Sequence, residues 1–129
     1  MLKRTLIGIL RSFETTGEKA KDPELKTRYY KLPKDRAWPE VVGALKKIPK
    51  LKVLHEVPNV GEIVCEKRTA LGRMQDVTVT LFAVSPVKTA IDIYSASRGS
   101  MGDLGSNYRT IQQIFKALDR ALSQYKITG

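Results

Sequence analysis

Residues 76–97 read DVTVTLFAVSPVKTAIDIYSAS, and their alternation decides the fold. Apolar side chains recur at every second position of residues 77–83 and again from Ile91, which is the period of a strand with one buried face. The segment SPVK between the two runs is typical of a tight turn, so the stretch predicts a β-hairpin. On its second strand one face carries Ile91, Ile93, Ser95 and Ser97, and the other carries Asp92, Tyr94 and Ala96.

The pattern that follows this hairpin changes to a helical period. Residues 107–126 place an apolar stripe on one helical face, and Asn107 stands where a helix N-cap is favoured. A long amphipathic helix needs an apolar surface to cover, and the alternating strands supply one. The stripe consists of Ile111, Ile114, Phe115, Leu118, Leu122 and Tyr125.

Upstream of residue 76 the sequence predicts three more strands and one more helix. The runs 51–57 and 62–70 flank the turn PNVG and form a hairpin, and residues 27–33 form the first strand. Between the first strand and this hairpin, Asp35 caps a helix in which Trp38 is a core anchor. The predicted fold is therefore α+β in the order β-α-β-β-β-β-α, with a single antiparallel sheet of about five strands and two helices on one face. This order matches the topology of TATA-binding-protein-like folds.

The first 26 residues differ in composition from the rest. Residues 1–13 form an amphipathic segment, whose apolar run is too short to span a membrane. Residues 14–26, ETTGEKAKDPELK, are polar and contain Gly17 and Pro23, which favours a linker or loose loop. We therefore expect an N-terminal segment and linker over 1–26 and a single domain over 27–129.

The chain has 129 residues, 23 Lys and Arg and 13 Asp and Glu, which gives a net charge of +10. Half of this excess lies in residues 1–34, which carry nine basic and four acidic residues. The remainder is spread thinly, without an arginine-rich tract, so a solvated basic surface is favoured over a specific nucleic-acid site. The alternative is that the basic N-terminal segment binds nucleic acid or lies on an anionic membrane surface.

The sequence contains one cysteine, Cys65, and one histidine, His55. A single cysteine excludes an intramolecular disulfide and a zinc site built on paired cysteines, and fits a reducing, cytoplasmic setting. We interpret Cys65 as a small buried hydrophobic residue and His55 as a strand residue with no assigned chemistry. No metal and no cofactor are predicted.

The junction between the last strand and the last helix, SASRGSMGDLGSN at residues 95–107, has an unusual composition. It contains three glycines and four serines in thirteen residues. In a structural interpretation, Asn107 or Asp103 caps the helix and Arg98 pairs with Asp103. In a functional interpretation, the junction is an anion site, where amide groups, hydroxyls and a guanidinium converge on a phosphate, sulfate or carboxylate. The candidate residues are Ser95, Ser97, Arg98, Asp103, Asn107 and Arg109.

The motif SASR-x4-DLG-x-N in this junction resembles the family called domain of unknown function 1499. RYYKLP before an AW-containing helix, a DVTV strand and IDIYSASR agree with it, and the resemblance covers roughly residues 28–118. The chain departs from the family at Ser100, where a glycine is usual. After the asparagine the family tends to carry several basic residues, of which this chain has only Arg109. Before the V-x-V strand the family commonly has two adjacent acids, of which this chain has only Asp76, preceded by Gln75. The resemblance implies a fold and draws attention to the junction, and it implies no activity.

These observations favour a non-catalytic module that binds a ligand or partner, such as an anionic small molecule, at the junction. One alternative is an enzyme in which Arg98 orients an anionic substrate and Asp103 or Asp76 is the general base. A Ser-His-acid set built on His55 is disfavoured, because His55 lies on a different predicted strand from the serines. The third hypothesis is the basic nucleic-acid- or membrane-binding protein described above.

Overall fold

The computed structural model describes residues 13–98 and 105–127, which form one sheet and a layer of helices. The strands are β1 (Phe13–Thr15), β2 (Arg28–Tyr30), β3 (Leu51–Val57), β4 (Glu62–Arg68), β5 (Met74–Ser85) and β6 (Lys88–Ser97). The α-helices are α2 (Lys34–Lys46) and α3 (Ser106–Ala121), and short 3-10 helices cover Pro23–Leu25 and Ser123–Tyr125.

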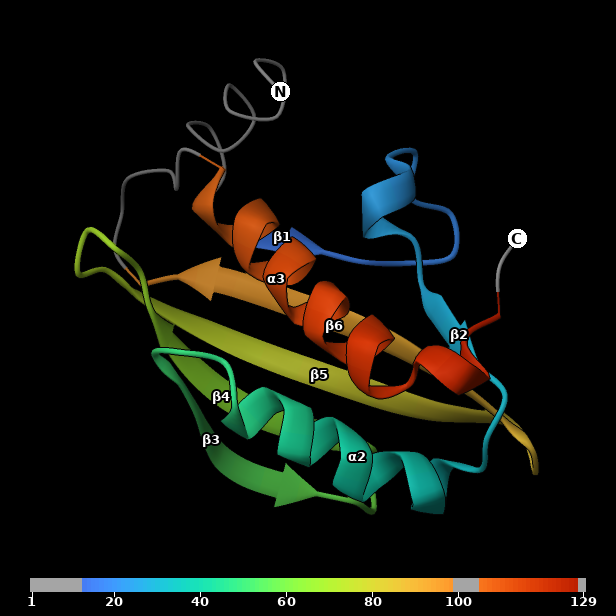
Figure 1. Cartoon of the computed structure of the whole chain (residues 1–129). Helices are drawn as coiled ribbons and strands as arrows, with labels where there is room; N and C mark the ends of the chain where they lie inside the picture. Colours follow the sequence, from blue (N-terminus) through green and yellow to red (C-terminus); the bar gives the residue numbers. More distant parts are fainter. Residues whose placement is uncertain (1–12, 99–104, 128–129) are drawn as a thin grey trace.

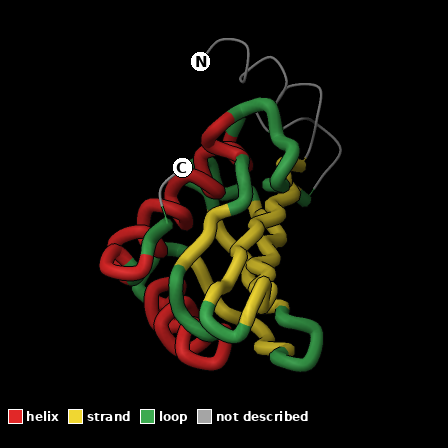
Figure 2. The backbone as a smooth tube through the Cα atoms, turned by 90° about the vertical axis from the view of Figure 1, so that its right-hand side faces the viewer, coloured by secondary structure: helices red, strands yellow, loops and turns green. Residues whose placement is uncertain are grey.

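All strand pairs of the sheet are antiparallel, and the strand order is β1-β6-β5-β4-β3. The outer edge of β6 is shared, since β1 pairs with residues 94–96 and β2 with residues 89–91. Both α-helices lie on one face of the sheet, and the other face is open (Figures 1 and 2). The α+β class and the arrangement of the helices are therefore as predicted, with six strands in the sheet.

The core lies between the sheet and the two helices, where the strand and helix periods meet. Val77, Val79 and Leu81 of β5 lie on the same face of the sheet as Ile91 and Ile93 of β6, and all five side chains are buried. Both predicted helical stripes are largely buried against this surface. The buried stripe residues are Val41, Val42, Leu45 and Ile48 in and just after α2, and Ile111, Ile114, Phe115, Leu118 and Leu122 in and just after α3.

The structure differs from the predicted loose loop over residues 14–26. Phe13–Thr15 form an edge strand, and Phe13, predicted as helical, stacks on Tyr94 with ring centroids 6.0 Å apart. Leu25 is buried in the core, so the loop from β1 to β2 packs on the domain. Residues 1–12 of the predicted amphipathic segment lie outside the described residues.

Asp92 explains why this polar loop adheres to the sheet. Its Oδ1 accepts hydrogen bonds from the hydroxyls of Thr16 at 2.6 Å and Thr27 at 2.8 Å. The Thr16 hydroxyl also accepts a hydrogen bond from the backbone N–H of Ile93 at 2.8 Å. Two threonines separated by eleven positions therefore join at one carboxylate, which ties the segment between β1 and β2 to β6.

Two local predictions are wrong. Asp35 does not cap α2, because the helix begins one residue earlier and Pro33 occupies the N-cap position without a side-chain hydrogen bond. Ala83 is exposed, so the buried alternation of β5 ends at Leu81, and the β5–β6 register then shifts between Ala83 and Ser85.

We predict that Asp92→Ala lowers the free energy of unfolding by about 1–3 kcal/mol, because two buried threonine hydroxyls lose their acceptor. Asp92→Asn keeps an oxygen acceptor at the same position and should lose less. Urea unfolding of both variants measures the difference. Equal midpoints for the two variants would contradict the assigned role of Oδ1.

Candidate functional site

The serines of the predicted junction site are part of a buried hydrogen-bonded cluster. The Ser95 hydroxyl donates to Asn107 Oδ1 at 2.6 Å, and Asn107 Nδ2 donates to Ser97 Oγ at 2.9 Å. Ser95 and Asn107 are fully buried, and Ser97 is 9% exposed. Asn107 therefore joins β6 to the first turn of α3 with its side chain, and it is not the N-cap residue that the sequence suggested.

A second pair of bonds extends this cluster to β5. Gln75, fully buried, accepts a hydrogen bond from the Thr110 hydroxyl at 2.6 Å and donates from Nε2 to Ser106 Oγ at 3.1 Å. Within the described part of the chain, every buried side-chain nitrogen and oxygen has a partner. Because these groups satisfy one another, the cluster is a structural connection between the sheet and α3.

Arg98 points away from this cluster, to the open face of the sheet. Its side chain donates to Asp76 at 2.6 and 3.0 Å and to Glu66 at 3.0 Å, and it is 48% exposed. These bonds, that to Asp76 first and that to Glu66 second, raise the pKa of the guanidinium above its ordinary value. Arg98 thus pairs with two acids on neighbouring strands.

The partner expected for Arg98, Asp103, lies in residues 99–104, outside the described residues. The helix α3 begins after Gly105, whose φ of 83° lies in the left-handed region that glycine tolerates best. Gly105 thus has the conformational role that the structural interpretation gave to the glycines of the junction.

Arg109 lies in a different environment, on the exposed side of α3. It lines a pocket of about 280 Å³ with Lys67 of β4 and Arg73, which precedes β5. Ser106 and Thr110 of α3 add hydroxyl groups, and Thr69, Ala70, Leu71 and Gln113 complete the lining. We call this concavity the basic pocket, since three of its lining residues are basic and, among those that the structure describes, none is acidic.

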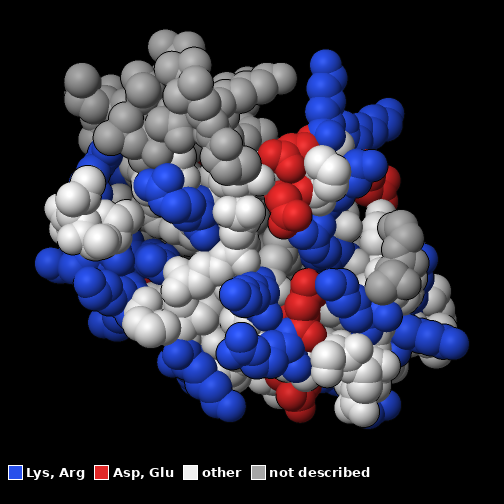
Figure 3. Space-filling model, turned by 45° about the horizontal axis from the view of Figure 1, so that its top comes forward, with Lys and Arg blue, Asp and Glu red and all other residues white. Residues whose placement is uncertain are grey.

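The fold explains how three cations meet there. Ile63, Cys65 and Lys67 alternate on the helix-facing side of β4, so the last of them reaches the region below α3. The β4–β5 turn, closed by hydrogen bonds between Thr69 and Arg73, returns the chain to the same place. Lys and Arg side chains lie at the left of Figure 3, the side where this turn lies in Figure 1, and also at its centre and right, where the Asp and Glu side chains are found.

The electrostatic environment of Lys67 reflects this concentration of positive charge. Burial, and then the neighbouring positive charge of Lys50, lower the pKa of the Lys67 ammonium group. An anion bound nearby would offset both effects, because it favours the charged form of the lysine.

The sequence pairs neither Lys67 nor Arg73 with Arg109, since 42 positions separate the first from the last. The useful signal is that EKR at 66–68 and GR at 72–73 flank one hairpin turn, which places basic residues on both sides of it.

The other reactive side chains do not assemble a catalytic set in the part of the chain that is described. His55 is exposed on β3, and β4 and β5 separate it from the serines of β6, which face the helices. Cys65 is buried, and burial raises the pKa of its thiol to about 12, which suppresses the nucleophilic thiolate. In residues 13–98 and 105–127, no group of three or more His, Cys, Asp and Glu residues is placed to hold a metal ion.

The family model "Protein of unknown function (DUF1499)" matches residues 11–118. The chain belongs to this family. The match confirms the resemblance seen in the junction and extends it upstream to include β1.

Comparison with solved and curated proteins adds little to this assignment. The crystal structure of TTHA0849 from Thermus thermophilus is similar over 76% of this chain and 92% of that one, with 12% identity and a TM-score of 0.37. No curated protein matches the chain. Of the helices formed by the described residues, none is both long and apolar enough to cross a membrane.

We predict that Asn107→Ala lowers the free energy of unfolding by about 1–3 kcal/mol, because it leaves two buried serine hydroxyls without their partner. Gln113→Ala is the control, since Gln113 is exposed on the same helix; asparagine has the lower helix propensity of the two, so propensity alone would favour the Asn107 replacement. Urea unfolding provides the comparison. Equal midpoints for the two variants would show that the cluster does not hold α3.

Proposed function

We propose that the protein is a non-catalytic binding module and that its anion site is the basic pocket. One observation carries the proposal: Lys67, Arg73 and Arg109, from three separate segments, line one concavity, and none of the described residues that line it is acidic. A phosphate, sulfate or carboxylate would receive charge-assisted hydrogen bonds from these groups. The positive end of the α3 dipole adds to the attraction, because the helix starts at Ser106 in the pocket wall.

This site adjoins the junction, of which Ser106 lines the pocket, but most of the residues that bind differ from those chosen from the sequence. Of the six residues chosen from the sequence, Arg109 lines the pocket, while Ser95, Ser97 and Asn107 are engaged with one another behind it. Arg98 is engaged on the opposite face by Asp76 and Glu66. The ligand class stays an anionic small molecule, or an anionic group on a larger partner.

We expect inorganic phosphate and pyrophosphate to bind in the pocket and to shift the backbone amide NMR signals of residues 67–73 and 106–110. The double variant Lys67→Gln, Arg109→Gln should weaken pyrophosphate binding about tenfold or more, on the order of 1.4 kcal/mol. Raising the salt concentration should weaken binding as well, because the contacts are largely ionic.

The matched control is the double variant Lys116→Gln, Arg120→Gln, which removes the same number of charges farther along α3. It should leave pyrophosphate binding within about twofold. If both double variants weaken binding equally, the attraction comes from the overall charge and the assignment to the basic pocket is wrong.

A further inference from the structure

A second concavity lies in the outer surface of the helix layer. Helices α2 and α3 run in opposite directions across the sheet (Figure 1). Between them is a groove of about 490 Å³, which spans Pro39–Pro49 on the first helix and its end and Gln113–Ala121 on the second. At a rise of about 1.5 Å per residue, the groove is about 12–15 Å long. Its volume lies in the range of small-molecule sites, about 300–1,000 Å³.

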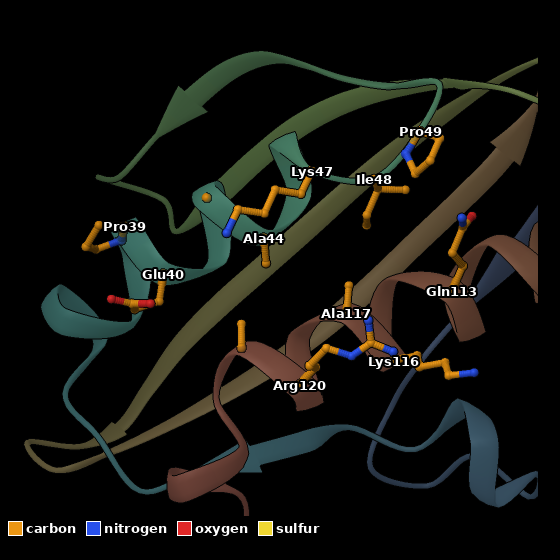
Figure 4. Close-up of a pocket in the computed structure, with 12 residues that line it drawn as sticks. Pro39, Glu40, Ala44, Lys47, Ile48, Pro49, Gln113, Lys116, Ala117 and Arg120 are labelled. Atoms are coloured by element: carbon orange, nitrogen blue, oxygen red, sulfur yellow. The ribbon is translucent and has the colours of Figure 1, made fainter.

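The base of this groove is apolar and built from small side chains. Figure 4 shows Ala44, Ile48 and Ala117 pointing into the space between the helices. Gly43 and Ala121 continue the same surface. Because most of these side chains are small, the apolar floor of the groove stays accessible to solvent.

Gly43 is the most informative of these residues. Glycine in the interior of a helix costs about 1 kcal/mol relative to alanine. A Cβ atom added at Gly43 would meet no atom within 4 Å, so neither packing nor backbone geometry requires a glycine at this position. Its effect on the structure is to keep the groove open.

The rim of the groove is basic. Lys47 extends from the end of α2, and Lys116 and Arg120 from α3, against the single acid Glu40. None of these three cations forms an ion pair with another residue of 13–98 or 105–127. Their charges are therefore available to a bound anion.

We propose that this groove binds a single-chain anionic amphiphile, an alkyl chain that ends in a carboxylate or phosphate. The chain lies on Gly43, Ala44 and Ala117, and the rim cations Lys47, Lys116 and Arg120 bind the headgroup. The combination of one apolar trough with cations on both sides matches a ligand that has one apolar chain and one anionic end.

The proposal does not depend on the basic pocket, although Gln113 lines both sites. The pocket is smaller than the groove, about 280 Å³ against about 490 Å³, and it predicts binding of inorganic anions that carry no chain. The two sites therefore call for different probes, and the charge variants of each serve as controls for the other.

The test titrates the full chain with dodecyl phosphate and dodecanoate below their micelle concentrations, with calorimetry as the measurement. Neutral dodecyl maltoside and cationic dodecyltrimethylammonium have the same alkyl chain as dodecyl phosphate and serve as ligand controls. With pyrophosphate present to occupy the basic pocket, we expect saturable one-to-one binding of both anionic ligands, at least tenfold weaker binding of the neutral ligand and none of the cationic one. Shortening the chain should weaken binding by roughly twofold to fourfold per methylene, the upper value being that of full burial.

Three variants assign this binding to the groove. Gly43→Leu fills the trough and should weaken dodecyl phosphate binding at least tenfold, while its thermal midpoint stays equal to or above that of the parent chain. Lys116→Gln with Arg120→Gln should weaken the anionic amphiphiles about fivefold to tenfold, and Lys67→Gln with Arg109→Gln should leave them within twofold. The last variant separates failure of this proposal from failure of the basic pocket, because it weakens pyrophosphate alone.

Several outcomes would overturn the proposal. Equal binding of dodecyl maltoside and dodecyl phosphate would show that no cation is used, and unchanged binding to a folded Gly43→Leu variant would place the chain elsewhere. Binding of an acidic amphipathic peptide that Gly43→Leu abolishes, without binding of either anionic amphiphile, would assign the groove to a protein partner.

Discussion

The two-residue alternation of β6 determines which side chains of this protein can meet. Ile91 and Ile93 point to the helices and enter the core, while Asp92 and Tyr94 point to the open face. The strand continues past the end of the apolar core, and its next two helix-facing residues are Ser95 and Ser97. Buried hydroxyl groups are costly without partners, so these two positions require polar side chains opposite them.

The first turn of α3 meets that requirement. Apolar contacts hold most of this helix, but they are weakly directional and would tolerate small shifts along the sheet. The bonds between Asn107 and two serines, and between Gln75 and both Thr110 and Ser106, are directional and fix the position of the helix start. The walls of the basic pocket, formed in part by the same turn, are therefore held in place from behind.

The features predictable from the sequence are those with a regular period along the chain. The β5–β6 hairpin and the α3 stripe are both visible as repeats, and both are found where expected. The strand β1 has three residues, one of them the buried Glu14, which is too short and too polar to show a period. Its attachment through Asp92 and Thr16 joins positions 76 residues apart, and that pairing leaves no local trace.

The partner of Arg98 shows the same limit at the candidate site. Within the junction, Asp103 is the acid nearest to Arg98 in the sequence, so sequence separation alone favours it as the ion-pair partner. In the sheet, Glu66 lies opposite Asp76 on neighbouring strands, so both carboxylates face Arg98 from β4 and β5. The alternation that places Arg98 on the open face thus also separates it from the serines of the same strand.

The distribution of positive charge follows from the fold rather than from the total of +10. The cations of the open face are partly neutralised, as Arg98 shows, whereas the helix side gathers basic residues from β4, the β4–β5 turn, the end of α2 and α3 into two concavities. Gln113 lines both concavities, and seven residues of α3, or about 10 Å along the helix, separate Arg109 in the basic pocket from Lys116 at the groove. This is only slightly more than the Debye length of about 8 Å at physiological ionic strength, so salt screens the two sets of charges from each other in part. An anion in one concavity therefore lowers the positive potential in the other to a modest extent, and the two sites draw on the charge of the same helix.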